Sequence, residues 1–507
     1  MNNFTQTLLF AASIVLAPAA VADGPYLATG TYAGGPGNDI PRAMDIGPDG
    51  SIFITGYTTS PGLPNAIGSL SGSMDIFVMK LSSDMTTLHW SAYIGGVGQF
   101  HHLEFATDCA ATPDGGVVIT GRTETPDFPT LNALDNTLGG STDAVLLKLD
   151  GNGNVVFSTL IGGSGTENAE DGGLGKFMGE VEVASDGSIF LAGNTRSADF
   201  PLVNPIDGTF GGFQDDVFFM KISADGQTIL ASTYLGDEYR DEVWGMRLDA
   251  EDRPVLVGNA GPAWPYTAGA YSFGTPSSSG VVYVTKLASD ALSIAWSGRL
   301  DRVDFSGGHL TFTELAINTR SDGTISVVGY ATGGGFPVPA DAYQPNIGSG
   351  SPTQDAIAFS FAADGSAITA GTFLGVWNVG EVAGAVGVDS FGQVLLPINI
   401  ITSGGTPNRF YKLNAEMTAL VAGPFMLTYP GGTLQVRVDD DNNLVALAMG
   451  VGETTPGAFQ EVHPGGGAAY VARWDMMDPP TTGNPADIDG DGMVGFSDLL
   501  LVLGEWS

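Results

Sequence analysis

The stretch Asp75-Ile-Phe-Val-Met-Lys80-Leu81 is one strand of a unit that the chain repeats. The six matching stretches are, in chain order, 143–149, 216–222, 281–287, 355–361, 408–413 and 468–474. The chain has only six lysines, and five of them occupy the same position of this stretch. Chance does not explain such a placement, and a period of this kind indicates a repeat architecture.

Each unit contains the same parts around the lysine strand. A first strand, such as 42–46, leads through the turn Pro48-Asp49-Gly50 into a second strand at 51–56. A loop follows, often with an aromatic residue before proline, and after the lysine strand a fourth strand ends in a pair such as Gly95-Gly96. Asp-Gly supplies the positive φ that two-residue hairpin turns need. Seven units of four antiparallel strands predict an all-β, seven-bladed β-propeller.

The two ends of the repeat region complement each other. The last unit has a first strand (434–438), a second (444–449) and a third (468–474), but no fourth. The segment 26–32 is a fourth strand without the first three. Because an open strand edge invites aggregation, we expect the N-terminal strand to pair with the last unit and close the ring.

The overall charge excludes one class of partner. Acidic residues outnumber basic ones 55 to 18, which gives a net charge of −37. Nucleic-acid-binding proteins need a basic face, so nucleic acid is not expected as a partner. Cys109 is the only cysteine, so no intramolecular disulfide can form, and its setting predicts a small core residue.

The first 22 residues resemble a secretory signal peptide. Leu8 to Ala17 form an apolar core, and Ala20-Val-Ala22 has the small residues that a signal peptidase accepts. No other stretch approaches the length that spans a bilayer. We expect cleavage after Ala22 and a secreted protein, extracellular or at the cell surface.

The predicted organisation is a signal peptide at 1–22, a propeller at 23–475, a linker at 476–485 and a calcium loop with an apolar helix at 486–507.

The repeat resembles a known bacterial family. The Gly-Gly strand ends, the Asp-Gly turns, Thr55-Gly56 and Thr120-Gly121, and the strands that run from Asp to Lys-Leu are similar to those of SBBP-type seven-bladed propeller repeats. The resemblance covers about residues 24 to 475 and is strongest in the first three units. It implies a propeller fold and an extracellular setting, and it implies no established catalytic activity.

The tail carries a motif with calcium-ligand spacing. Carboxylates stand at positions 1, 3, 5 and 12 of a twelve-residue loop, and Gly492 is at position 6. Calcium takes six to eight hard oxygen ligands, and a carbonyl at position 7 supplies another. The predicted Ca²⁺ ligands are Asp487, Asp489, Asp491, Met493 through its carbonyl, and Asp498.

This tail resembles one half of a type I dockerin repeat, the calcium module that docks onto cohesin domains. A full dockerin has two such repeats, and this chain has one. The helix expected at 497–506 is apolar nearly all round, so it should not be stable alone in water. It could pack on the propeller, dock on a cohesin-like or cell-surface protein, or serve as a recognition tail for secretion or attachment.

The repeated lysine needs a partner, since Ile76, Val78 and Lys80 share one face of their strand. An acid recurs near the start of the first strand, at Asp39, Glu104, Glu242 and Glu381. We interpret lysine and acid as a structural ion pair within or between blades. The alternatives are acids that rim the central channel and bind cations, and a lysine that acts as a base.

Two classes of function remain. The first is a non-catalytic binding or scaffold protein, tethered through its calcium-binding tail, with a glycan as one candidate ligand. The second is an extracellular enzyme that acts on polysaccharides, a lyase or a glycosidase, because propellers host both. His101 and His102 are adjacent and would point to opposite faces of a strand, so they do not suggest a metal site. No unit carries a polar insertion that looks catalytic; residues 166–179 are glycine-rich instead. The sequence therefore favours the first class.

Overall fold

The structure is a computed structural model of the whole chain. It describes residues 26–97, 103–168, 179–212, 214–273, 281–300, 316–332, 336–348, 354–375, 380–383, 385–400, 409–426 and 433–476. The chain divides into two units, one formed by Leu27–Trp474 and the other by its two ends, Met1–Tyr26 and Asp475–Ser507. In the second unit, Tyr26 Oη donates a hydrogen bond to Asp475 Oδ2 at 2.9 Å. The predicted signal peptide, linker, calcium loop and helix lie outside the described residues, apart from Met476.

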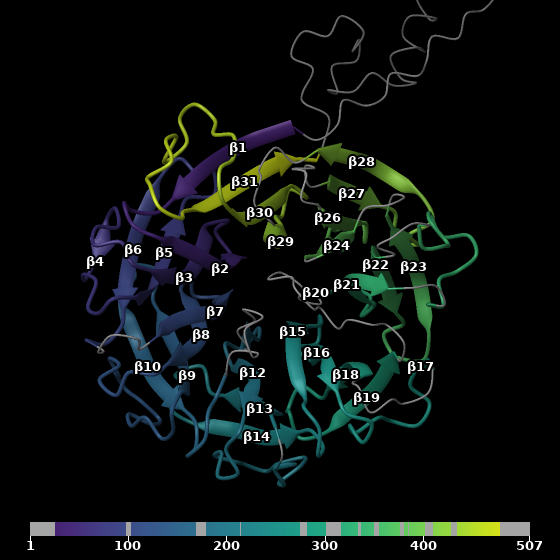
Figure 1. Cartoon of the computed structure of the whole chain (residues 1–507), viewed down its shortest axis with the longest axis horizontal. Coiled ribbons are helices and arrows are strands. Elements are labelled where there is room, and N and C mark those ends of the chain that lie inside the picture. Colours follow the sequence, from purple (N-terminus) through teal and green to yellow (C-terminus); the bar gives the residue numbers. More distant parts are fainter. Residues whose placement is uncertain are drawn as a thin grey trace, which may run out of the picture. The chain divides into compact units, whose positions relative to one another are not determined.

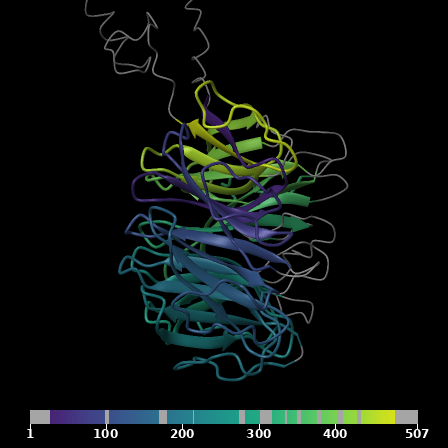
Figure 2. The ribbon, with the colours of Figure 1, turned by 90° about the vertical axis from the view of Figure 1, so that its left-hand side faces the viewer.

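Seven sheets follow one another around a common centre, as the sequence predicts (Figure 1). Seen from the side, the strands of successive blades cross the molecule in layers (Figure 2). Blade one contains β2 (Asp39–Ile46), β3 (Ile52–Thr58), β5 (Asp75–Leu81), β6 (Leu88–Ile94) and the short β4 (Ala66–Ile67). Blade two contains β7 (Glu104–Ala111), β8 (Val117–Thr123), β9 (Asp143–Leu149) and β10 (Val155–Ile161). Blade three contains β11 (Glu180–Val183), β12 (Ile189–Thr195), β13 (Asp216–Ile222) and β14 (Ile229–Leu235).

The remaining blades keep this order, from the innermost strand to the outermost. Blade four contains β15 (Glu242–Leu248), β16 (Pro254–Ala260), β18 (Val281–Leu287), β19 (Ile294–Leu300) and the short β17 (Ser272–Phe273). Blade five contains β20 (Ala316–Thr319), β21 (Ile325–Thr332), β22 (Gln354–Phe361) and β23 (Ile368–Leu374). Blade six contains β24 (Glu381–Ala383), β25 (Gly387–Val388), β26 (Val394–Ile400), β27 (Arg409–Leu413) and β28 (Leu420–Met426). Blade seven contains β29 (Thr433–Val438), β30 (Leu444–Met449), β31 (Ala469–Asp475) and β1 (Tyr26–Ala33).

The predicted ring closure is confirmed, because β1 is the outermost strand of blade seven and lies beside β31 (Figure 1). The backbone N–H of Tyr32 donates to Gln460 O at 3.1 Å, and that of Thr455 donates to Gly30 O at 3.1 Å. The rings of Tyr32 and Tyr470 lie 5.7 Å apart. The two ends of the propeller are thus joined by backbone pairing and by aromatic packing.

The hydrophobic core is divided among the spaces between adjacent blades. One cluster brings Phe53 and Trp90 of blade one against Val117 and Leu147 of blade two. Cys109 is buried in this cluster, which confirms its prediction as a core residue. Because each blade buries both faces against neighbours, nearly every position of its second and third strands is apolar or uncharged.

The first turn of blade one differs from the prediction in its type. Gly47 N donates to Ser51 O at 2.7 Å, and Gly50 N donates to Gly47 O at 2.8 Å. Gly50 has φ +75°. This is a three-residue loop, a type I turn followed by a left-handed glycine. Pro48 explains the difference, since its fixed negative φ fits a type I turn and not a two-residue primed turn.

The loop between the second and third strands covers the outer edge of several blades. Leu131 and Ser158 exchange two backbone hydrogen bonds of 3.0 and 2.8 Å, and Val203 and Ser232 exchange another two. The aromatic residue before proline anchors this loop, as Trp264 does by stacking on Tyr283 with ring centroids 4.0 Å apart. The covered edge is thereby protected from pairing with another chain. No helix that could cross a membrane occurs in the part of the chain that the structure describes.

Candidate functional site

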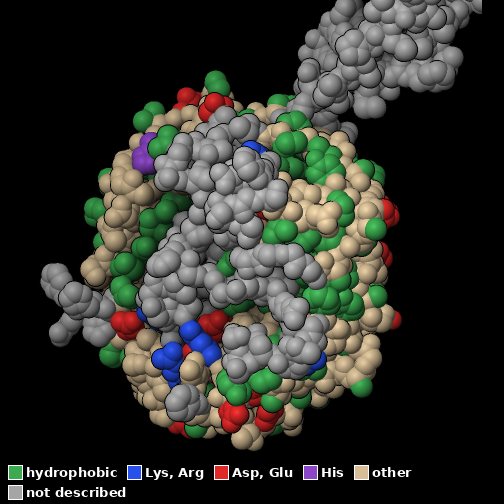
Figure 3. Space-filling model, turned by 45° about the vertical axis from the view of Figure 1, so that its right-hand side comes forward, with side chains coloured by type: hydrophobic (Ala, Val, Ile, Leu, Met, Phe, Trp, Pro, Cys, Tyr) green, Lys and Arg blue, Asp and Glu red, His purple; other side chains and the backbone are tan. Residues whose placement is uncertain are grey.

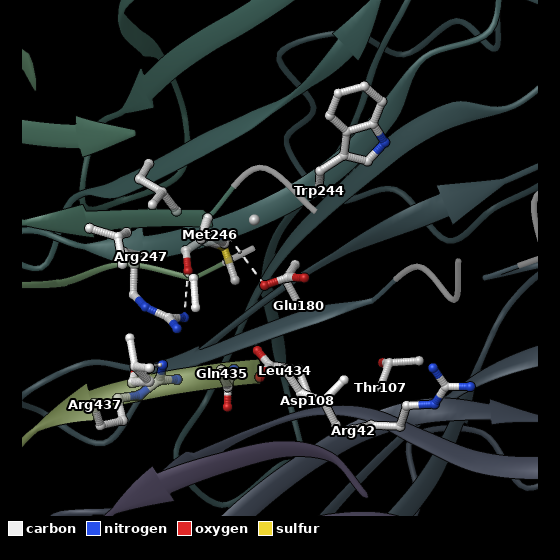
Figure 4. Close-up of a pocket in the computed structure, with 16 residues that line it drawn as sticks. Arg42, Thr107, Asp108, Glu180, Trp244, Met246, Arg247, Leu434, Gln435 and Arg437 are labelled. Carbon is white, nitrogen blue, oxygen red and sulfur yellow. Dashed lines mark hydrogen bonds between the residues drawn. The ribbon is translucent and has the colours of Figure 1, made fainter. Parts of the chain in front are cut away.

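The innermost strands surround a central channel, and the described part of the channel holds one small polar cavity (Figure 4). Its lining comes from β2, β7, β11, β15, β20, β29 and the segment before β25. The lining residues are Arg42, Thr107, Asp108, Glu180, Trp244, Gly245, Met246, Arg247, Ala316, Ile317, Ala385, Val386, Leu434, Gln435, Val436 and Arg437. Charged side chains from opposite sides of the ring therefore meet in the centre.

Four inner strands direct side chains to the cavity through β-bulges. The pairing register skips Arg42 in β2, Thr107 in β7, Trp244 in β15 and Leu434 in β29. A bulge leaves one extra residue outside the ladder and turns its strand locally. All four skipped residues line the cavity. The bulge therefore directs a different side chain into the cavity from each of these four inner strands.

Two ion pairs in the channel join neighbouring blades. Arg247 Nη1 of blade four lies 2.6 Å from Glu182 Oε1 of blade three. Arg437 Nε of blade seven lies 2.9 Å from Asp45 Oδ1 of blade one. Each of these side chains is between 16% and 25% exposed, so the pairs are shielded from bulk water without being sealed from it.

Four polar side chains of the channel accept hydrogen bonds from the backbone of the next blade. Gln435 Oε1 accepts from Met44 N at 2.6 Å, and Asp45 Oδ2 accepts from Ala111 N at 2.8 Å. Asp108 Oδ2 accepts from Val181 N at 3.0 Å. Glu180 Oε2 accepts from Met246 N at 3.3 Å (Figure 4). These hydrogen bonds link the inner strands of successive blades through side chains of the channel.

The electrostatics agree with a structural role. Burial raises the pKa of Glu182 to about 7, while the positive charge of Arg247 opposes that rise. Burial also raises the pKa of Asp108, against the opposing charges of Arg247 and Arg437. The cavity itself is about 50 Å³. One water needs roughly 10–15 Å³ of such space, so the cavity has room for a few waters or a small ion.

The repeated lysines form ion pairs within their blades, as predicted, but with a different acid. Lys148 Nζ lies 2.8 Å from Asp114, Lys412 Nζ lies 3.0 Å from Asp389, and Lys80 Nζ lies 3.5 Å from Asp49. Lys286 and Asp249 are both buried and lie 2.5 Å apart. The partner acids belong to the first turn of the blade, at the end of the strand opposite to the predicted acids. Lys221 departs from this pattern, since its Nζ donates to Ser289 O at 2.8 Å.

The predicted acids lie where one blade passes into the next. Asp39 accepts from Gly35 N at 2.7 Å and from Ser60 Oγ at 2.8 Å, and Glu104 accepts from Gly96 N at 3.0 Å. The prediction that these acids pair with the lysines was therefore wrong. Glu381 does have a cation beside it, because Arg409 Nη1 lies 3.7 Å away.

Sequence reasoning missed two members of this set. Glu167 accepts from Thr195 Oγ1 at 2.8 Å, as Glu104 does from Thr123 at 3.3 Å. Residues 169–178 stand between Glu167 and β11, so Glu167 falls outside the repeat spacing. In blade four the equivalent residue is Asp241, whose carboxyl accepts from Asp237 N at 2.7 Å and from Gly261 N at 2.9 Å. Its neighbour Glu242, the predicted residue, instead pairs with Arg240 at 3.0 Å.

Another charged group lies where blades three and four meet. Arg196 Nε lies 2.5 Å from Asp215 Oδ1, and Arg240 Nε lies 3.1 Å from Asp215 Oδ2. Asp215 is buried, and Arg196 is about half exposed. Figure 3 shows a group of Lys and Arg side chains beside acidic ones on one face of the molecule, where most other described side chains carry no charge.

The calcium ligands predicted at Asp487, Asp489, Asp491, Met493 and Asp498 lie outside the described residues, as do His101 and His102. Within the described ranges, no three His, Cys, Asp or Glu side chains gather in a way that could hold a metal ion.

No protein-family model and no curated protein sequence matches the chain. Solved structures do match it. Hydrazine synthase of Kuenenia stuttgartiensis is 11% identical, with 80% of this chain and 92% of that one covered and a TM-score of 0.43. The β-propeller domain of the Trilobed protease from Pyrococcus furiosus, described as having an open velcro topology, is 10% identical over 91% and 99%, with a TM-score of 0.41. The polysaccharide lyase Uly1 is 10% identical over 89% and 98%, with a TM-score of 0.39. Likeness at this level concerns the fold alone, and propellers serve both enzymes and proteins without catalytic activity.

Proposed function

We propose that this chain is a secreted, non-catalytic propeller of the SBBP-type repeat class, which works as a binding or scaffold protein. In this proposal the propeller presents its connecting loops to a ligand, with a glycan as one candidate. The tail at 486–507 binds Ca²⁺ and attaches the protein to a cohesin-like or cell-surface partner.

The channel chemistry is the observation that carries this proposal. Asp45, Glu182, Arg247 and Arg437 pair with one another across blade boundaries, and Asp108 accepts a hydrogen bond from the next blade. A catalytic acid or base must reach the proton it transfers in a bound substrate. Here the ionisable groups are already engaged with the neighbouring blades, so they hold the ring together.

The tail supports the binding half of the proposal through its chemistry. Alternating carboxylates at Asp487, Asp489 and Asp491 suit the hard oxygen ligation of Ca²⁺, and Gly492 permits the sharp turn of the loop. A bound ion would order the start of the helix at 497–506. That helix carries enough leucine to need an apolar partner.

Attachment tests the proposal directly. We expect the intact mature protein to remain in the cell-surface fraction in Ca²⁺ and to be released by a chelator. The double substitution Phe496→Asp with Leu500→Asp should abolish retention, because it places charges on the apolar face. Val462→Asp is the matched control, since Val462 is an exposed apolar residue of the propeller, 77% accessible. Full retention of the double variant would refute the docking role of the tail.

Activity measurements separate the non-catalytic function from the enzyme alternative. The purified protein, incubated with common acidic and neutral polysaccharides, should bind without releasing new reducing ends or unsaturated products. Turnover that survives purification would replace the scaffold function with that of a lyase or a glycosidase.

A further inference from the structure

The glycine at the end of each outer strand is enclosed by carboxyl groups at several blade boundaries. A Cβ on Gly95 would stand 2.3 Å from Glu104 Oε2 and 2.6 Å from Asp75 Oδ1. The two carboxyl oxygens therefore approach the same point beside Gly95. Glu104 begins β7 of blade two and Asp75 begins β5 of blade one, so the two carboxyl groups meet across the boundary.

The same arrangement recurs at the next two boundaries. A Cβ on Gly162 would stand 2.5 Å from Glu167 Oε2 and 2.7 Å from Asp143 Oδ1. A Cβ on Gly236 would stand 2.9 Å from Asp241 Oδ2 and 3.1 Å from Asp216 Oδ1. We call these three sites the acid-pair joints. Their six acids are Asp75, Glu104, Asp143, Glu167, Asp216 and Asp241.

Burial makes two negative charges costly at these joints. All six side chains are at most 1% exposed. None of the six forms an ion pair with Lys or Arg among the residues that the structure describes. Moreover, Asp216 Oδ1 is buried without a hydrogen-bond partner in the described part of the chain. Two carboxylates that share such a site cannot both ionise easily.

The groups that face each joint are acidic or phenolic, with two arginines near the third. Asp127 and Tyr93 lie by the first joint, and Asp135 and Asp199 lie by the second. The third joint is faced by Asp207, Asp215, Asp237, Tyr234 and Tyr283. Arg196 and Arg240 are the nearby cations, and both are held by Asp215.

We propose that each acid-pair joint holds at least one proton between its two carboxyl groups, and that loss of the shared proton as the pH rises past neutral loosens the ring between blades one and four. The propeller is then a pH-responsive structure, tight in mildly acidic surroundings and weakened in alkaline ones. A protonated carboxyl can donate a hydrogen bond to its neighbour, whereas two ionised carboxylates at the same joint would repel each other.

The direction of the pH effect follows from the pKa values. Burial raises the pKa of Glu104 and Glu167 to about 7, of Asp216 to about 7 and of Asp241 to about 8. In the unfolded chain such groups titrate near pH 4. A carboxyl whose folded-state pKa is raised contributes its full stability below the unfolded pKa. That stability is lost as the pH rises through the folded pKa, here between pH 4 and 8.

Equilibrium unfolding of the full chain in urea from pH 5 to pH 9 tests the proposal. We expect the unfolding equilibrium constant of the wild type to rise at least about tenfold per joint over this range. A triple variant, Glu104→Gln, Glu167→Gln and Asp241→Asn, should lose the part of this pH dependence that comes from the joints, since the amides cannot ionise. Glu182 in the channel, whose pKa burial also raises to about 7, keeps its own smaller part. Loss of the slope supports the proposal whatever the absolute stability of the variant.

Two controls separate the joints from general charge repulsion. Asp440→Asn removes an exposed acid of the turn after β29 and should leave the slope unchanged. Measurement in about 0.5 M salt should also preserve it, because salt screens exposed charges much more than buried ones. If the triple variant fails to fold, the pH dependence of each single variant, compared with that of the wild type, still tests the proposal. A wild-type stability that does not fall between pH 5 and 8, or a slope that is as steep in the variants as in the wild type, would overturn the proposal.

Discussion

The boundary between blades one and two and the boundary between blades five and six have acids at the same two positions, but they differ in one cation. Asp75 and Glu104 meet at the first with no arginine or lysine paired to either among the described residues. At the second, Asp355 packs against Gly375, while Glu381 lies 3.7 Å from Arg409 Nη1. Equivalent buried acids are therefore stabilised in two ways: by a shared proton at the first boundary, and by the positive charge of Arg409 at the second.

Deletion of residues 23–35 should have the largest effect, since it removes the closing strand on which every blade boundary depends. Without β1, blade seven loses the packing of Tyr32 against Tyr470 and exposes β31 as an open edge. We expect the cooperative thermal transition to disappear in calorimetry. An unchanged melting temperature would refute the closure and with it the ring that both boundaries share.

Two of the repeated lysines form ion pairs that differ in how far the partner acid is exposed, so they test how much burial changes the contribution of an ion pair to stability. Lys286 and Asp249 are both buried, whereas Asp114, the partner of Lys148, is 64% exposed. Lys286→Met should destabilise the protein by about 2 kcal/mol, because it removes one of the two cations that bind buried Asp249 and leaves only Arg253. Lys148→Met should cost less than about 1 kcal/mol. Urea unfolding at pH 7 measures both, and equal losses would contradict the contrast.

The two blade boundaries should respond to the same substitution with opposite signs. At pH 8, Glu104→Gln removes a charge that has no cation, so we expect stabilisation of about 1 kcal/mol or more. Glu381→Gln removes a charge beside Arg409, so we expect a loss of about 1 kcal/mol. At pH 5 the gain from Glu104→Gln should vanish. If both variants change stability in the same direction at pH 8, the distinction between the boundaries is wrong.

The channel contact of Gln435 should give a small effect. Gln435→Leu deletes the hydrogen bond that Met44 N donates across the boundary of blades seven and one. A net loss of about 1 kcal/mol follows from one neutral hydrogen bond. A loss of several kcal/mol would show that the channel contacts act as one network.

Much of this fold could be predicted because it depends on local patterns that repeat. The stretch from Asp75 to Leu81 fixes the third strand, and the unmatched strands at 26–32 and 434–474 predict how the ring closes. The partners of the charged residues could not be predicted in this way. Lys80 pairs with Asp49 and Glu104 meets Asp75 because of strand register and blade stacking, which sequence spacing does not encode. Glu167 was missed since an insertion separates it from its strand.

The protonation of the acid-pair joints can be measured most directly by NMR on protein labelled with ¹³C at the glutamate carboxyl carbons. Signals of Glu104 and Glu167 would be assigned by their loss in Glu104→Gln and Glu167→Gln. We predict that both titrate near pH 7 in the folded protein, as burial beside a second carboxyl requires. Midpoints near pH 4, the ordinary value for an exposed glutamate, would contradict it.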